Sequence, residues 1–181
     1  MALSSTIYTF TIELADVDRG VYQSLALKVA RHPSETEEYL LTRVLAYCLE
    51  YAEGVSFSKG VSDTEEPAVT VRDLTGALVT WIEVGGPDAA RLHKASKAAP
   101  RVVIYSHREP RLLLRSWEGG KIHRAEAIEL YAIDKEFLAG IIARLDRRTA
   151  FSLSVSDRQL YLTIGEETLS MTLERTSLVP D

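Results

Sequence analysis

Residues 73–88, which read DLTGALVTWIEVGGPD, carry the strongest signal for the fold of this chain. The apolar run from Ala77 to Val84 is typical of a buried strand, and it contains one carboxylate, Glu83. A second carboxylate, Asp73, stands ten residues earlier, at the turn that leads into the strand. A charge inside an apolar strand costs free energy unless a partner pairs or ligates it. Two acids brought together across a hairpin repel each other, which raises the pKa of one of them or favours a divalent cation.

Outward from this strand, helical and strand patterns alternate. The patterns predict further strands over 6–14, 55–59, 68–72, 102–105 and 127–133, and helices over 17–30, 34–52, 88–99 and 134–145. The helix over 17–30 depends on Val21, Leu25 and Val29, which repeat every four residues, with Leu27 beside them. Ser34 and Glu37 match a capping box at the start of the next helix. An acidic loop, 63–66, separates the strands over 55–59 and 68–72, while 111–117 fits a helix or a strand.

The apolar period changes to two after Arg148. Three short alternating segments follow, over 151–155, 160–164 and 169–173, and this pattern is typical of a β-meander. No internal repeat or interdomain linker is visible. The sequence therefore predicts a single α/β domain over residues 1–181, with a central mixed sheet flanked by helices over 1–147 and the meander appended over 148–181.

Composition favours a globular protein of the cytoplasm. A chain of 181 residues with 46% apolar composition can bury a substantial core. Residues 1–5 lack a basic segment and an apolar segment of the secretory type, and no apolar run is long enough to span a membrane. The single cysteine, Cys48, has no partner for an internal disulfide. We therefore expect a cytoplasmic protein without membrane contact, and the oligomeric state stays open.

Positive charge is concentrated in residues 88–124, although the whole chain carries −5. This segment has nine Lys or Arg residues against three Asp or Glu residues, so it carries +6 and leaves −11 on the rest. Such asymmetry predicts a phosphate-facing surface on an acidic protein, with Arg91, Lys97 and Arg101 as contacts for nucleic acid. The alternative is a set of solvated charges scattered over helix faces.

Three strings resemble the YaeQ family: HPSETEE at 32–38, WIEVG at 81–85 and GPD at 86–88, together with TIY at 6–8. Their order and spacing fit the family over the whole chain. The resemblance implies a variant of the restriction-endonuclease-like, PD-(D/E)xK nuclease fold. That fold carries an Asp at a hairpin, a Glu-x-Lys on the next strand and an acid on the preceding helix.

The resemblance assigns Asp73 as the first acid, Glu83 as the second and Glu38 as the helix acid. Gly85 stands where the lysine is usual, so Lys94, or Lys97, on the following helix is the candidate replacement. In this assignment Asp73 and Glu83 ligate Mg²⁺ or Mn²⁺, and the metal activates water for phosphodiester hydrolysis.

Each of these residues also has a structural interpretation. Asp73 suits a plain hairpin turn, and Glu83 suits a salt bridge with Arg72 or Lys94. Glu38 suits a helix N-terminus, where the dipole favours a negative charge.

Two functions remain open at this stage. The first is a metal-dependent, nuclease-related protein whose catalytic residues are Glu83, Asp73, Glu38 and Lys94. The second is a catalytically inactive module of the same fold that binds nucleic acid or a protein partner. The enzyme requires a divalent metal and Glu83, whereas the module depends on Arg91, Arg101 or Arg108 and is indifferent to metal.

Overall fold

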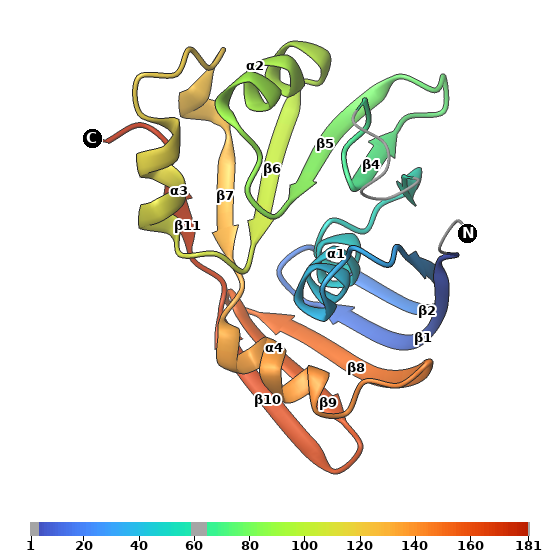
Figure 1. Cartoon of the computed structure of the whole chain (residues 1–181). Coiled ribbons are helices and arrows are strands. Elements are labelled where there is room, and N and C mark those ends of the chain that lie inside the picture. Colours follow the sequence, from blue (N-terminus) through green and yellow to red (C-terminus); the bar gives the residue numbers. More distant parts are fainter. Residues whose placement is uncertain (1–3, 59–64, 181) are drawn as a thin grey trace. The chain divides into compact units, whose positions relative to one another are not determined.

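A computed structural model describes residues 4–58 and 65–180 and confirms the α/β class. The chain divides into two compact units, Met1–Leu41 with Asp134–Leu173 and Thr42–Ile133 with Glu174–Asp181. Each unit has its own mixed sheet, so the strands do not share the one central sheet that the sequence predicts (Figure 1). A single domain over 1–181 stays a prediction.

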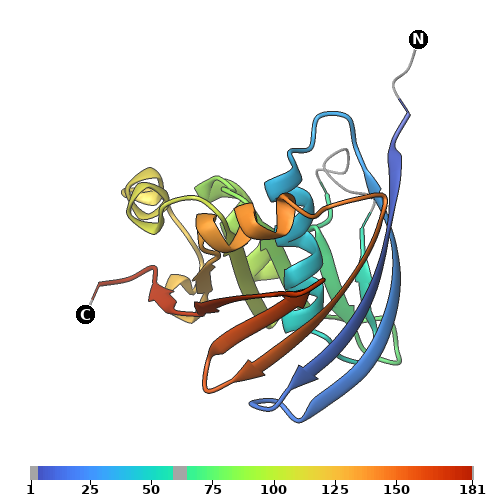
Figure 2. The same cartoon turned by 90° about the horizontal axis from the view of Figure 1, so that it is seen from below.

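The sheet of the first unit has the strand order β10-β9-β8-β1-β2. Its strands are β1 (Thr6–Asp16), β2 (Val21–Arg31), β8 (Arg148–Ser156), β9 (Gln159–Ile164) and β10 (Glu167–Thr172). The predicted meander is confirmed as β8, β9 and β10, but it is not an appendage, because β8 pairs in parallel with β1 of the N-terminal hairpin. Helix α4 (Lys135–Ile142) packs against β10 of this sheet, where its Gly140 lies against Leu169 (Figure 2).

The helix predicted over 17–30 is wrong, since Val21–Arg31 is strand β2. Val21, Leu25 and Val29 lie four residues apart, and four is a multiple of the strand period of two as well as close to the helical period. Leu27 distinguishes the two, because it is buried together with Leu25 and Val29 while the residues between them are exposed.

Helix α1 (Glu37–Leu49) begins later than the sequence predicts. Its first turn is capped by Thr36, whose Oγ1 accepts a hydrogen bond from Tyr39 N at 3.1 Å. Ser34 instead lies in the preceding turn, with its hydroxyl 2.7 Å from Nδ1 of His32. The predicted capping box of Ser34 and Glu37 is therefore wrong: the N-cap is Thr36, and Tyr39, not a Glu or Gln, stands three residues after it.

The sheet of the second unit has the strand order β11-β7-β6-β5-β4-β3. Its strands are β3 (Val55–Phe57), β4 (Val69–Arg72), β5 (Leu78–Val84), β6 (Arg101–Ser106), β7 (Glu129–Ala132) and β11 (Arg175–Ser177). Helices α2 (Ala89–Ala98) and α3 (Pro110–Trp117) and the 3₁₀ helix η1 (Ala125–Ala127) complete this unit. The segment that fitted a helix or a strand is thus helix α3. Trp81, Leu92, Ile104, Trp117 and Leu130 belong to one buried cluster, which joins α2 and α3 to the sheet.

Lys59, at the end of the strand predicted over 55–59, and Asp63 and Thr64 of the acidic loop lie outside the described residues. Among the helices that the structure does describe, none combines the length and the apolar character that a membrane crossing requires.

Candidate functional site

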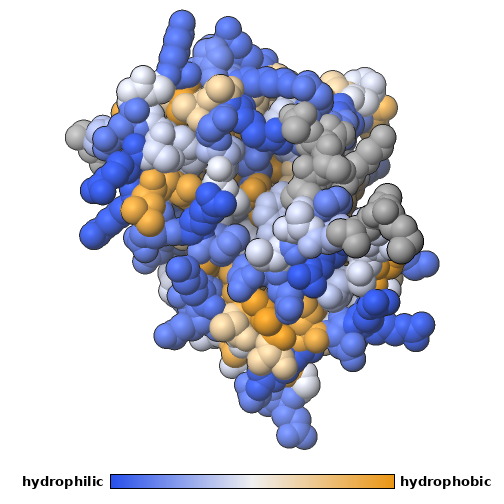
Figure 3. Space-filling model, in the orientation of Figure 1, coloured by the Kyte–Doolittle hydropathy of each residue, from blue (hydrophilic) through white to orange (hydrophobic). Residues whose placement is uncertain are grey.

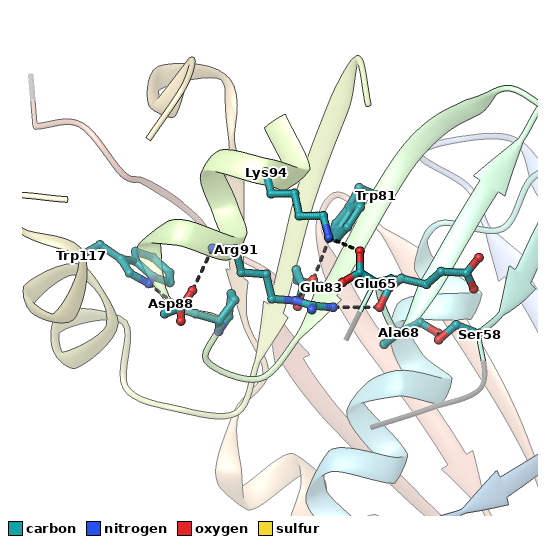
Figure 4. Close-up of polar contacts among 11 residues, drawn as sticks. Ser58, Glu65, Ala68, Trp81, Glu83, Asp88, Arg91, Lys94 and Trp117 are labelled. Carbon is teal, nitrogen blue, oxygen red and sulfur yellow. Dashed lines mark hydrogen bonds and ion pairs between the residues drawn. The ribbon is translucent and has the colours of Figure 1, made fainter. Parts of the chain in front are cut away.

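Glu83 lies near the carboxyl end of β5, and its side chain is buried (Figure 4). Because strand side chains alternate between faces, Glu83 shares its face with Trp81, two residues earlier. Glu83 Oε1 accepts hydrogen bonds from Trp81 Nε1 at 2.7 Å and from Arg91 Nε of α2 at 2.6 Å. The Arg91 guanidinium also lies over the Trp81 ring, 5.6 Å from the ring centre. The counter-charge of Glu83 is therefore Arg91, and neither Arg72 nor Lys94 takes that role.

Burial dominates the electrostatics of Glu83. Loss of water raises the pKa of this carboxyl, and the Arg91 charge and the Trp81 hydrogen bond only partly oppose that effect. Arg91 is fixed a second time, because its Nη2 donates to the carbonyl oxygen of Glu66 at 2.8 Å. Arg91, predicted to contact nucleic acid, is thus engaged inside the protein.

Asp73 is occupied by its own turn. Its Oδ1 accepts hydrogen bonds from Thr75 N at 2.9 Å, from Thr75 Oγ1 at 2.6 Å and from Ala77 N at 3.0 Å. These bonds, with the Thr75 hydroxyl first, lower the pKa of Asp73. This is the plain hairpin-turn role that the sequence offered as the alternative.

The β4–β5 hairpin keeps the two predicted metal ligands apart. Arg72, next to Asp73, pairs with Leu78 at the turn, whereas Val69 pairs with Ile82 at the other end. From Leu78 to Glu83 the strand rises by about 16 Å at roughly 3.3 Å per residue. The described residues contain no group of three or more His, Cys, Asp or Glu side chains arranged to hold a metal ion. The Asp73 and Glu83 pair therefore does not fit Mg²⁺ or Mn²⁺.

Lys94, the predicted replacement lysine, lies on α2 and donates from Nζ to Glu65 Oε2 at 2.5 Å (Figure 4). Both partners are substantially exposed, with 49% and 77% of their side chains accessible, so this ion pair contributes little to stability. Glu38 lies exposed in the first turn of α1, in the other compact unit. Its role as an auxiliary acid stays a prediction.

Arg101, at the start of β6, binds two carboxylates. Its Nη1 donates to Glu50 Oε2 at 2.5 Å and its Nε to Glu129 Oε2 at 2.7 Å. Tyr105 and Tyr131 donate their hydroxyls to the same two acids, at 2.7 Å and 2.9 Å. Arg101 is therefore part of an internal network, in which its one positive charge faces two carboxylates.

The segment after α3 runs along α2 through three contacts. Trp117 Nε1 donates to the carbonyl oxygen of Pro87 at 2.7 Å. Gly120 lies so close to Ala89 that a Cβ at position 120 would come within 2.6 Å of the Ala89 Cβ. His123 N donates to His93 Nδ1 at 3.0 Å, and the two imidazole rings are 6.3 Å apart at an angle of 85°.

This arrangement gathers four basic side chains, His93 and Lys97 from α2 and Lys121 and His123 from the segment after α3, which we call the His93 cluster. Loss of water lowers the pKa of His93, and the neighbouring charges of Lys97, Lys121 and His123 lower it further. All the groups whose charges act on His93 are thus basic. Of the residues predicted for nucleic acid, Lys97 alone belongs to this cluster. His93, Lys121 and His123 were missed, although the four-residue spacing of His93 and Lys97 places them on one helix face.

The comparisons with known proteins agree along nearly the whole chain. The family model described as YaeQ protein matches residues 1–173. YaeQ of Escherichia coli (strain K12) is 32% identical over 176 residues, which cover 96% of each chain, and YaeQ of Salmonella typhi is 30% identical over 175 residues with the same coverage. The crystal structure of YaeQ from Pseudomonas syringae matches with a TM-score of 0.84 at 30% identity, over 98% of this chain and 97% of that one. The crystal structure of YaeQ from Xanthomonas axonopodis pv. citri matches with a TM-score of 0.85 at 26% identity, over 95% of this chain and 98% of that one. The chain belongs to the YaeQ family.

Proposed function

We propose that this protein binds the phosphate backbone of a nucleic acid through the His93 cluster, without cleaving it. The observation that supports the proposal is the convergence of two lysines and two histidines from separate segments, next to one another. Ammonium groups and protonated imidazoles are donors to phosphate oxygens, and such contacts supply most of the affinity in binding that is independent of sequence.

The distribution of ion pairs supports this choice of surface. Arg91, Lys94 and Arg101 are each bound to a carboxylate from outside residues 88–124, namely Glu83, Glu65, and Glu50 with Glu129. Lys97 and Lys121 form no ion pair with the described carboxylates within 4.0 Å. Their charge therefore stays available to an external anion.

The alternative of a metal-dependent phosphodiesterase gains less support. Its metal would have to replace Arg91 at Glu83, and Asp73 stands at the far end of the strand. The nuclease-like variant of the fold remains part of the proposal, because the order α1, β4, β5, α2 reproduces the succession of helix, hairpin and acid-bearing strand that the family resemblance implies. Cytoplasmic placement also remains a proposal.

The test is fluorescence anisotropy with a labelled single-stranded DNA and a duplex of the same length, at several salt concentrations. We expect saturable binding that weakens with salt, and we expect K97A/K121A to weaken it for both DNAs. The slope of log affinity against log salt should fall by about one for each lysine removed. The addition of EDTA should change nothing, because this surface needs no metal.

The matched control is K28A/K135A, which removes two lysines that are exposed in the other unit. This variant should keep wild-type affinity and slope. Absence of saturable binding at low salt, or equal losses in the two double variants, would reject the proposal.

A further inference from the structure

A cavity of about 290 Å³ lies against the segment that carries half of the His93 cluster. It is lined mainly by apolar side chains, among them Leu114, Trp117, Ile122, Leu178, Val179 and Pro180. Glu118 is the single charged residue among the described residues that line it. Leu114, Ile122 and Leu178 also pack against the buried cluster that contains Trp117, so the cavity wall is continuous with the core.

Ile122 connects the cavity to the charges. It lies between Lys121 and His123 in the chain, and consecutive Cα atoms are about 3.8 Å apart. The backbone of His123 is fixed to His93 by the 3.0 Å hydrogen bond from its N–H, which orients this short segment. The same three residues thus supply a positive surface and a wall of the apolar cavity. Figure 3 shows a further small apolar patch over α3. Leu112 belongs to this helix and is 62% exposed.

We propose that this cavity takes one unpaired nucleobase, whose phosphate lies on the His93 cluster. This inference rests on the proposed function and narrows it to single-stranded nucleic acid. The flat faces of a base suit apolar and aromatic walls, and the phosphate of the same nucleotide is assigned to Lys121 and His123, which flank Ile122 in the chain. Bases in a duplex are paired and stacked, so they cannot enter. The volume, just below the range of ordinary small-molecule sites, suits one ring system better than a long acyl chain.

The experiment compares affinities for oligo-dT and for a duplex of equal length, in wild type and in Ala125→Leu. Ala125 lines the cavity, so a leucine there occupies the space of the base while leaving every member of the His93 cluster in place. We expect wild type to bind the single strand about tenfold more tightly than the duplex. Ala125→Leu should bring that ratio close to one with duplex affinity retained. Ala143→Leu, at an exposed alanine of the other unit, is the control and should keep the preference.

Each outcome decides a different claim. If neither DNA binds, both the proposed function and this inference fail. If both bind equally in wild type and both weaken in K97A/K121A, the phosphate surface stands and the base cavity is rejected. If Ala125→Leu leaves the preference for the single strand over the duplex unchanged, the base cavity is also rejected. Should Ala125→Leu lose duplex binding, Val179→Phe, at a position that is 41% exposed, fills the same cavity and decides by the same ratio.

Discussion

A histidine held against three other basic side chains titrates differently once an anion arrives. In the free protein the pKa of His93 lies below its ordinary value, so the neutral ring is favoured in the folded state. Protonation of His93 therefore costs stability, and that cost appears as the pH falls below about 6.5, the value for an unperturbed histidine. A bound phosphate offsets the repulsion from Lys97, Lys121 and His123 and raises the pKa of His93, and the proton goes to Nδ1, which then no longer accepts the hydrogen bond from His123 N. Binding and protonation of His93 must then favour each other.

The expected consequence is affinity that increases as the pH falls from about 7.5 to about 6. The gain is limited to about tenfold per pH unit for each proton taken up. Anisotropy titrations at constant ionic strength measure it, and H93Q/H123Q should show a flat profile while it keeps the lysine contribution at the higher pH. An equally steep profile in H93Q/H123Q would assign the pH dependence to other groups.

At the same scale, the sequence predicted that Glu83 needs a partner but not which one. The sequence alone shows that Glu83 is an acid inside an apolar strand, which predicts that it needs a partner. Its burial with a hydrogen-bonded counter-charge agrees with that prediction. The partner was mistaken because Asp73 precedes the turn, and a hairpin places a residue before the turn far from the end of its second strand. Arg91 was available eight residues later, at the first turn of α2, but its docking against β5 depends on tertiary packing.

At the scale of the elements, the position of the segment after α3 against α2 depends on Gly120, which has no side chain. A Cβ at Gly120 would approach the Ala89 Cβ to 2.6 Å, and neither is a flexible side-chain end. We expect Gly120→Ala to move this segment away from α2, which separates His123 from His93 and weakens phosphate binding. Stability should change little, because Gly120 is exposed.

Ala89→Gly provides the matched rescue. It removes the opposing methyl group, so the double variant A89G/G120A should recover wild-type affinity even though glycine in the first turn of a helix costs stability. Anisotropy of the single and double variants measures this. No recovery in A89G/G120A would mean that the contact with Ala89 alone does not account for the effect, because a Cβ at position 120 also lies 3.2 Å from the carbonyl oxygen of Trp117.

The prediction of helices and strands failed where the spacing of apolar residues fits both the helical and the strand period, and it succeeded where the spacing fits only one of them. Val21, Leu25 and Val29 fit a helix and a strand equally, and only Leu27 separates the two interpretations. In the C-terminal meander, apolar and polar residues alternate strictly, as in the strand that contains Phe151. The three strands of the meander were therefore predicted correctly. What the sequence did not show was the parallel pairing of β8 with β1, since that contact joins segments more than 130 residues apart.

At the scale of the whole molecule, the charge count alone overstated the positive surface. The +6 of residues 88–124 includes Arg91, Lys94 and Arg101, which are bound to acids from other parts of the chain. The available surface is therefore smaller than the count suggests. A net charge of −5 and a local affinity for polyanions are compatible for this reason.

The interleaved topology predicts which fragments fold. The chain passes between the compact units after residues 41, 133 and 173, so a cut after residue 147 removes β8, β9 and β10 from the first sheet. Those strands carry seven buried apolar side chains: Phe151, Leu153, Val155, Leu160, Leu162, Ile164 and Met171. At about 1.5–3 kcal/mol each, their burial is comparable with the roughly 5–15 kcal/mol that stabilises a typical domain.

The fragment 1–147 should therefore leave β1 unprotected in amide hydrogen exchange. The fragment 1–173, which keeps all five strands and loses only β11, should protect β1 as the full chain does. Equal protection of β1 in both fragments would show that the N-terminal hairpin is stable without the meander, and would restore the boundary at residue 147 that the sequence predicts.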